Sequence, residues 1–210
     1  MSLRGFLDGC VKPSDQETLS LLYRMGYTRV LIPAGLNLEY RKASIKILRR
    51  STIKARTRKS ARSQIEETLR KDKPDIIAVE PETVDVARYA ATHKKVSLIR
   101  VTPGMERIVD ESTAILLRQK GYGALEVTLN YMLEPSYRAW RYLYFTLRRA
   151  AGYSIPIVFS SCARTPSMAW HPYHIAGIGS ILGIPPEKVL AWLSNSYQRL
   201  FPEGDRPEHA

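Results

Sequence analysis

The sequence has few cysteines and few side-chain amides. Its only cysteines are Cys10 and Cys162, and its 210 residues include three asparagines and four glutamines. Two cysteines are too few for a disulfide framework or a four-cysteine zinc site, so we expect a reducing compartment and two small buried side chains. Scarce amides and abundant arginine are typical of proteins from hot habitats, which makes a thermophile the expected source.

The sequence also lacks a long apolar run. No stretch approaches the roughly 20 residues that span a bilayer, and the first residues lack the charged-then-apolar pattern of a signal peptide. We therefore expect a cytoplasmic protein with no membrane partner. Hydrophobic residues make up 44% and charged residues 25%, as in globular proteins. The length predicts a single domain over residues 1–201, followed by a disordered polar tail at 202–210.

One long segment contains no acidic residue. The net charge of the chain is +12, and ten basic residues lie between residues 41 and 62 without an acid among them. They are Arg41, Lys42, Lys46, Arg49, Arg50, Lys54, Arg56, Arg58, Lys59 and Arg62. A solvated helix face usually mixes both signs, so this clustering favours a polyanionic partner, because cations near phosphates release condensed counterions.

Short β-branched runs alternate with longer amphipathic stretches along the whole chain. The pattern predicts seven mostly buried strands, at residues 5–7, 29–32, 46–54, 76–79, 97–101, 124–129 and 155–159. Helices are expected after a Ser14 cap as far as Gly26, and at residues 83–92, 110–120, 135–151, 168–182, 187–193 and 196–200. In the helix at 135–151, Trp140, Leu143, Tyr144 and Leu147 form a stripe that we interpret as core or partner surface.

Alternating strands and helices fit either a parallel barrel or an open doubly wound sheet. The first strand is followed by Asp8-Gly9-Cys10-Val11-Lys12-Pro13 and not by a glycine-rich phosphate loop, which counts against a nucleotide-binding open sheet. We therefore expect an α/β fold, a compact TIM-barrel-like β/α barrel. At this length, the helices are short or the strands number fewer than eight.

Three carboxylates, Asp8, Glu80 and Glu126, fall at predicted strand ends, where such barrels place their functional residues. A metal-dependent phosphoesterase would also need several histidine ligands, and the His171/His174 pair alone makes a weak site. We expect the carboxylates to pair with arginines, with a divalent ion as the alternative. Ser160 and Ser161 suit phosphate holding better than nucleophilic attack. No catalytic residue, metal site or cofactor is predicted.

The segment from residue 46 to residue 58 alternates with a period of two. Apolar Ile45, Ile47, Ile53 and Ala55 occupy odd positions, while the even positions are mostly basic, with Lys46, Arg50, Lys54, Arg56 and Arg58. A strand and the loop after it would present a row of cations about 6–7 Å apart, close to the phosphate spacing of RNA. Such contacts hold RNA in place without reading its sequence.

Several runs, in this order and spacing, resemble the archaeal ribonuclease P protein component 3 family. They are Asp75-Ile76-Ile77-Ala78-Val79-Glu80-Pro81, Val86-Ala87-Arg88, Val96-Ser97-Leu98-Ile99, Ala124-Leu125-Glu126-Val127 and Pro156-Ile157-Val158-Phe159-Ser160-Ser161-Cys162-Ala163-Arg164-Thr165-Pro166. The likeness covers most of residues 3–201. The sequence departs from the family at Cys162, where the family usually has glycine, and its first strand matches the family only loosely.

The resemblance implies a barrel-like, non-catalytic subunit of the ribonucleoprotein that removes 5′ leaders from precursor tRNA. In that holoenzyme the RNA subunit carries the catalytic metals, and component 3 pairs with component 2 and other protein subunits, contacting precursor tRNA only indirectly. On this basis we expect Arg88, Arg100 and Arg164 to contact RNA or a partner, together with Arg49, Arg50, Lys54, Arg56, Arg58, Lys59 and Arg62. The alternatives are a metal-dependent phosphoesterase and a protein-only assembly module that binds through the helix at 135–151.

Overall fold

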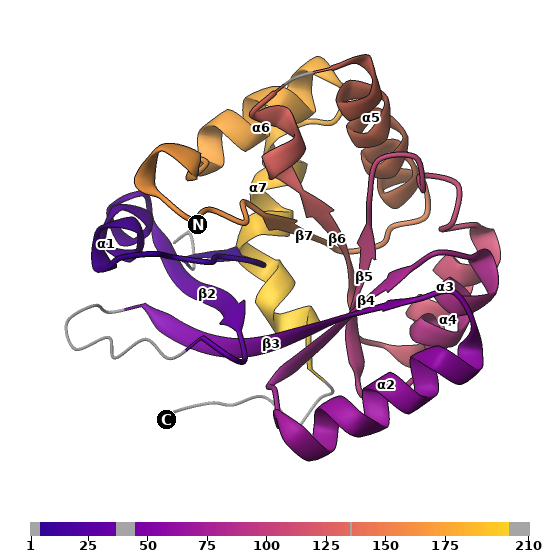
Figure 1. Ribbon diagram of the computed structural model, residues 1–210. Helices are drawn as coiled ribbons and strands as arrows, with labels where there is room; N and C mark the ends of the chain where they lie inside the picture. The colour runs from indigo at the N-terminus through magenta and orange to yellow at the C-terminus, as the bar shows by residue number, and fades with distance from the viewer. Residues whose placement is uncertain (1–4, 37–44, 135, 202–210) are drawn as a thin grey trace.

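The computed structural model describes residues 5–36, 45–134 and 136–201. Its core is a parallel sheet of seven strands that follow one another around the sheet in chain order (Figure 1). The strands are β1 (Phe6–Asp8), β2 (Tyr27–Pro33), β3 (Lys46–Ala55), β4 (Ile76–Pro81), β5 (Val96–Val101), β6 (Ala124–Thr128) and β7 (Ile157–Ser160). All seven predicted strands are confirmed, with ends that shift by at most two residues.

The sheet curls into a nearly closed barrel whose seam lies between β1 and β7. Beyond the two strands, the Gly9 N–H donates to the Phe159 carbonyl and the Lys12 N–H donates to the Ala163 carbonyl, both at 2.8 Å. A single parallel bridge joins Val11 to Ala163. Helix α7 (Pro186–Asn195) contacts both β1 and β7 and so covers the seam. The expected compact TIM-barrel-like fold is confirmed.

Helices surround the barrel. They are α1 (Gln16–Arg24), α2 (Arg58–Lys71), α3 (Val84–Thr92), α4 (Glu111–Lys120), α5 (Tyr137–Gly152), α6 (Pro172–Ile181) and α7, with short 3₁₀ turns η1 (Leu129–Met132), η2 (Pro166–Met168) and η3 (Ser196–Arg199). Thr83, Asp110 and Ser136 cap α3, α4 and α5 through their side chains. None of the helices in the described ranges is long and apolar enough to cross a membrane.

Helix α2 is the element that the sequence did not predict. Only Ala61 and Ile65 of this helix are buried, so it lacks the apolar stripe by which amphipathic helices are recognised. Thr57 starts it, because the threonine side chain accepts a hydrogen bond from the Ser60 N–H at 3.2 Å. The expected row of cations along a strand and a loop is therefore wrong beyond residue 57, since the next cations lie on a helix.

Two further helix starts differ from expectation. Asp15, and not Ser14, caps α1, accepting a hydrogen bond from the Thr18 N–H at 2.9 Å, while the Ser14 hydroxyl donates to the Arg164 carbonyl at 2.8 Å. The helix expected from residue 168 begins only at Pro172, after the turn η2. The tail at 202–210 and the cations Arg41 and Lys42 lie outside the described residues.

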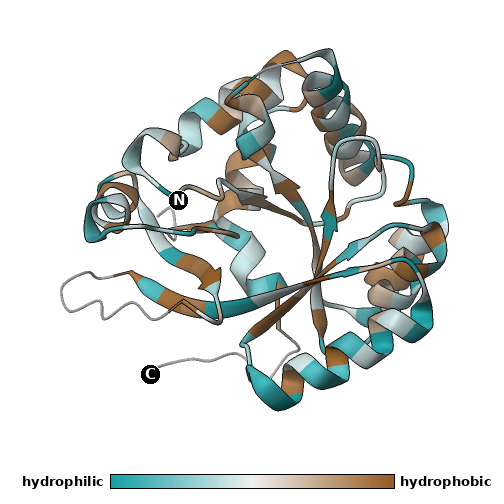
Figure 2. Ribbon diagram, viewed as in Figure 1, coloured by the Kyte–Doolittle hydropathy of each residue, from teal (hydrophilic) through white to brown (hydrophobic). Residues whose placement is uncertain are grey.

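Two apolar clusters separate the inside of the barrel from its outside. The larger cluster packs the helices on the outer faces of the strands. Figure 2 shows brown, hydrophobic stretches along the strands. The smaller one fills the inside, and Tyr197, Leu200 and Phe201 from the last described turn join it. In β3, Ile53 and Ala55 belong to the outer cluster and Leu48 to the inner one. The predicted alternation is thus confirmed, and the even, largely basic positions face the barrel interior.

Candidate RNA interface and the charged barrel mouth

A buried ion pair crosses the barrel above the inner apolar cluster. The Arg50 guanidinium of β3 donates to both carboxylate oxygens of Glu126 on β6, at 2.7 and 2.8 Å. Arg50 also donates to the Gly9 carbonyl and to the Thr52 hydroxyl. The two charged side chains are only 2% and 0% exposed. Burial, the largest single cause, would raise the pKa of Glu126. The charge and hydrogen bonds of Arg50, the Arg100 charge and a Ser160 hydrogen bond together outweigh it and hold this pKa below its usual value.

A second, more exposed layer of charges lies nearer the ends of the strands. The Arg100 Nε of β5 is 3.7 Å from a Glu80 oxygen, and the Lys54 ammonium is 3.8 Å from Glu80 and 3.3 Å from Glu82. The expected pairing of Glu80 and Glu126 with basic side chains is confirmed. Both carboxylates are thereby occupied by cations from the barrel wall, and Arg50 and Arg100 are held inside the barrel.

Asp8 behaves differently from the other two carboxylates. One of its oxygens accepts hydrogen bonds from the backbone N–H groups of Cys10, at 3.0 Å, and Ser161, at 3.1 Å. The other oxygen has no hydrogen-bond partner, and among the described residues no ion pair of Asp8 is recorded. Burial raises the pKa of Asp8 to about 6. Asp8 therefore fastens the end of β1 to the segment after β7.

The other polar candidates have local structural roles. Ser160 and Ser161 are both buried, and the Ser161 hydroxyl accepts from the Ala163 N–H at 3.0 Å, so neither presents a surface site for phosphate. The His171 ring caps α6 by accepting from the Tyr173 N–H. Within residues 5–36, 45–134 and 136–201, no three His, Cys, Asp or Glu side chains gather as a metal site would require.

A cleft of about 600 Å³ opens beside the charged mouth, between the ends of β4, β5 and β6 and the start of α5. Both signs of charge line it, with Lys54 and Arg138 against Glu80 and Glu134. A phosphate chain would meet carboxylates here, so the cleft suits RNA less well than the outer surface does.

Besides Arg50 and Arg100, four of the predicted RNA-contacting cations are paired with acids. Lys54 pairs with Glu80 and Glu82. The other pairs are Arg58 with Asp85, Arg62 with Glu66 and Arg88 with Asp110. Three of these five acids, Glu80, Glu82 and Asp85, come from the end of β4, the β4–α3 connection and the start of α3. The acid-free segment of the sequence is therefore partly neutralised in the fold.

Another four of the predicted cations are exposed. They are Arg49, Arg56, Lys59 and Arg164, and across the described residues the structure records no ion pair for any of them. Arg56 and Lys59 flank the first turn of α2, which contains no acidic residue. Arg164 follows β7 on the far side of the mouth, and Arg49 lies near the start of β4, where its N–H donates to Asp75.

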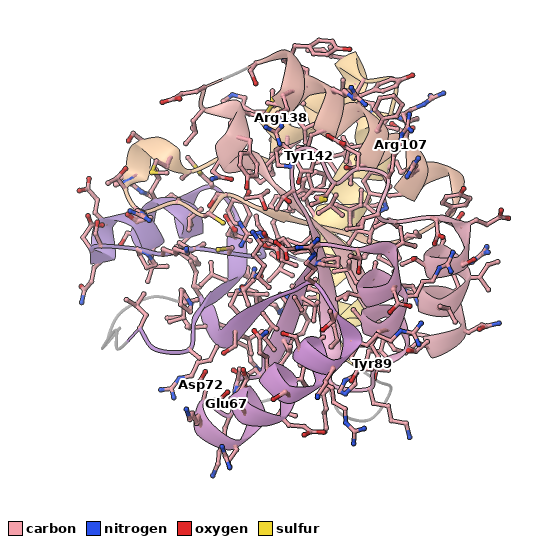
Figure 3. The ribbon with its side chains drawn as sticks, turned by 45° about the vertical axis from the view of Figure 1, so that its right-hand side comes forward. Glu67, Asp72, Tyr89, Arg107, Arg138 and Tyr142 are labelled. Carbon is pink, nitrogen blue, oxygen red and sulfur yellow. The ribbon has the colours of Figure 1, made fainter. Side chains whose placement is uncertain are left out.

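A second basic surface, which the sequence did not predict, lies on the outer face of α5. Tyr137 is 82% exposed, and Tyr144 and Phe145 are each 42% exposed. Of the two interpretations given for the stripe, core or partner surface, Tyr144 therefore does not fit the core. Arg141 lies over the Phe145 ring and Arg148 over the Tyr144 ring. The spacing of 137, 141, 144 and 148 marks one helix face and was a usable signal. Figure 3 shows Arg138 of α5 at the opposite side of the molecule from Glu67 and Asp72 of α2.

These observations define a basic β/α-barrel protein with a mouth of paired charges and two cation-bearing outer faces. The chain belongs to the RNase P subunit p30 family, whose model matches residues 5–206. It is 37% identical to the ribonuclease P protein component 3 of Aeropyrum pernix, over 96% of this chain and 99% of that protein. This membership favours the interpretation as an RNase P subunit over that as a phosphoesterase.

Two solved structures share the fold. A chain in the cryo-EM structure of archaeal ribonuclease P with mature tRNA superposes with a TM-score of 0.73 at 20% identity, covering 92% of this chain and 89% of that one. The crystal structure of an uncharacterized protein gives a TM-score of 0.54 at 13% identity, covering 92% and 75%. At such identities, the two likenesses support the barrel fold alone.

The buried ion pair predicts that substitutions at two adjacent arginines differ greatly in their effect on the free energy of unfolding. Arg50→Met leaves Glu126 charged and buried without a partner, which should lower the free energy of unfolding by about 3–5 kcal/mol in guanidinium titrations. Arg50→Met combined with Glu126→Leu should recover most of this loss. Arg49→Met, on the opposite face of the same strand, should stay within about 0.5 kcal/mol. Equal losses at the two arginines would contradict this assignment.

The buried Asp8 carboxyl predicts that the free energy of unfolding falls as the pH rises. Because its pKa is raised to about 6 from 3.8, the native chain binds more protons than the unfolded chain between these values. The free energy of unfolding should therefore fall by about 3 kcal/mol as the pH rises through this window. Asp8→Asn, which can still accept both backbone hydrogen bonds, should abolish the fall, whereas Asp15→Asn at the exposed cap should retain it. Parallel pH profiles of the two variants would refute the prediction.

Proposed function

We propose that this chain is a protein subunit of ribonuclease P that binds the RNA subunit and supports it in removing 5′ leaders from precursor tRNA. The observation that carries the proposal is the full-length likeness to the component 3 protein of Aeropyrum pernix. The net charge of +12 supports it independently, because a polyanionic partner offsets the self-repulsion of such a chain. Precursor tRNA is contacted indirectly, through the RNA. A cytoplasmic location belongs to the same proposal.

The start of α2 is the part of the chain best suited to hold RNA phosphates. A helix N-terminus presents backbone N–H groups and the positive end of the helix dipole. The first turn of α2 contains no acid, and the exposed Arg56 and Lys59 flank it. The paired cations Arg58, Arg62 and Arg88 surround this turn and can exchange their carboxylate partners for phosphate when RNA approaches. Buried Arg50 and Arg100 hold the barrel together instead.

Salt dependence tests this placement. Replacing the three exposed, unpaired cations at the rim, Arg56, Lys59 and Arg164, with glutamine should flatten the log–log salt dependence of binding to RNase P RNA by about 2–3 units, since each phosphate contact contributes about 0.7–0.9. Binding is measured by filter retention across a salt series, after a melting curve confirms that the variant folds.

A matched control removes three exposed cations from the opposite end of the barrel. Lys94, Lys95 and Arg118 each lie shortly before a strand begins, so their replacement with glutamine lowers the net charge equally without altering the rim. The control should leave the slope nearly unchanged. Equal flattening in both variants would mean that the total charge, and not the rim, governs binding.

We propose further that the outer face of α5 binds ribonuclease P protein component 2. Exposed aromatic side chains interleaved with arginines are the residues most enriched at the energetic centres of protein interfaces. The rings of Tyr137, Tyr144 and Phe145 are exposed and are not buried in the core of the chain. This face lies away from α2, so the chain can contact RNA and a protein at the same time.

A binding experiment without RNA tests this second surface. Substituting Tyr137, Tyr144 and Phe145 with alanine should weaken binding to component 2 by about 100-fold or more in calorimetric titrations. Tyr23→Ala with Ile115→Ala, which removes exposed apolar side chains from α1 and α4, should leave the affinity unchanged. Full affinity of the triple variant would exclude α5 as the contact.

A further inference from the structure

The two cysteines, separated by most of the chain, lie directly across the barrel seam from each other. The Cys162 N–H donates to the Cys10 carbonyl at 2.6 Å, within the stretch of parallel hydrogen bonding that joins β1 to β7. Neighbouring strands are spaced about 4.8 Å apart. This spacing falls within the Cα separation of about 4.4–6.8 Å that a disulfide requires.

The two sulfur atoms also share one environment. The Cys162 thiol hydrogen-bonds to the Cys10 sulfur, which lowers the pKa of Cys10, and the Arg50 charge lowers this pKa further. An Arg100 N–H donates to the Cys162 sulfur at 3.9 Å. Both sulfur atoms therefore lie beside the same pair of arginines, and the Arg50 charge stabilises the Cys10 thiolate that disulfide chemistry needs.

The backbone and a cavity add two independent observations. Cys162 has a φ of 50°, a left-handed conformation that favours glycine over a residue with a Cβ atom. The sequence thus keeps a thiol at the seam although the backbone conformation at this position favours glycine. Cys10 lines an open cavity of about 470 Å³ together with Lys12, Arg50 and Arg100, so this buried residue borders a space that is open to small molecules.

We propose that Cys10 and Cys162 form a redox pair, which a small-molecule disulfide oxidises to a covalent bond across the barrel seam. The Cys10 thiolate attacks the small disulfide and expels one thiolate, leaving a mixed disulfide. Cys162 then loses its proton and attacks the Cys10 sulfur, expelling the second thiolate. The two protons of the cysteine pair end on the two released thiols, so that two protein thiols and one disulfide become one protein disulfide and two thiols.

The bond would act where the barrel is weakest. Between β1 and β7 the regular ladder is replaced by a few hydrogen bonds and one bridge. Cross-linking residues so far apart in sequence restricts the unfolded chain strongly, which raises the melting temperature. The link would also hold the ends of the first and last strands at a fixed distance.

Titration of the purified full chain with oxidised glutathione tests the proposal. The expected product is a monomer that has lost two hydrogens in mass, gives one peptide pair linked through Cys10 and Cys162 after digestion, and melts roughly 5–15 °C higher than the reduced protein. An unchanged mass with both thiols still open to alkylation would overturn it. So would accumulation of a stable glutathione adduct, because it would show that the second thiol cannot reach the first.

Cys162→Gly is the matched control, because glycine accepts the left-handed backbone at this position. This variant should fold at least as well as the reduced chain and show no rise in melting temperature with oxidised glutathione. Cys10→Ala should likewise show none. A similar rise in either variant would mean that the oxidant stabilises the protein without a bond between these two sulfurs.

Discussion

The bidentate pair between Arg50 and Glu126 is the interaction on which the barrel interior depends. It spans from β3 to β6 and reaches β1 through the Gly9 carbonyl, so three strands from different parts of the ring meet in one hydrogen-bonded unit. A buried pair of this kind contributes little net stability compared with apolar packing, but breaking it is costly. It therefore fixes which strands face one another, while the apolar clusters supply the stability.

The same pair explains why this mouth differs chemically from a metal-dependent hydrolase. Glu80 and Glu126 face cations that come from other strands of the barrel, and they are neutralised before any ligand arrives. Arg50 and Arg100, which the sequence analysis predicted to contact RNA or a partner, instead pair with these carboxylates. The surface left for a polyanion is then the outside of the rim, where the start of α2 lies.

The sequence predicted the strands well and the partners of the charges poorly, and the reason is physical. A buried parallel strand is apolar on both faces, and this is a local property of a few adjacent residues. Helix α2 has only Ala61 and Ile65 to bury, so its pattern carried almost no signal. The acids that neutralise Lys54 and Arg58 lie 26 to 28 residues along the chain, at Glu80, Glu82 and Asp85, and only the folded barrel brings them together.

The position of the seam has a consequence for how the chain folds during its synthesis. Residues 8–12 meet their partners at 159–163, so β1 emerges from the ribosome long before anything exists to close it. Closing so long a loop has an entropic cost, and the contacts that offset this cost form only once β7 is in place. Helix α7 and the turn that fills the base of the barrel follow later still. The last quarter of the chain therefore closes the barrel, and until it is made the growing polypeptide is a curved sheet with two open edges.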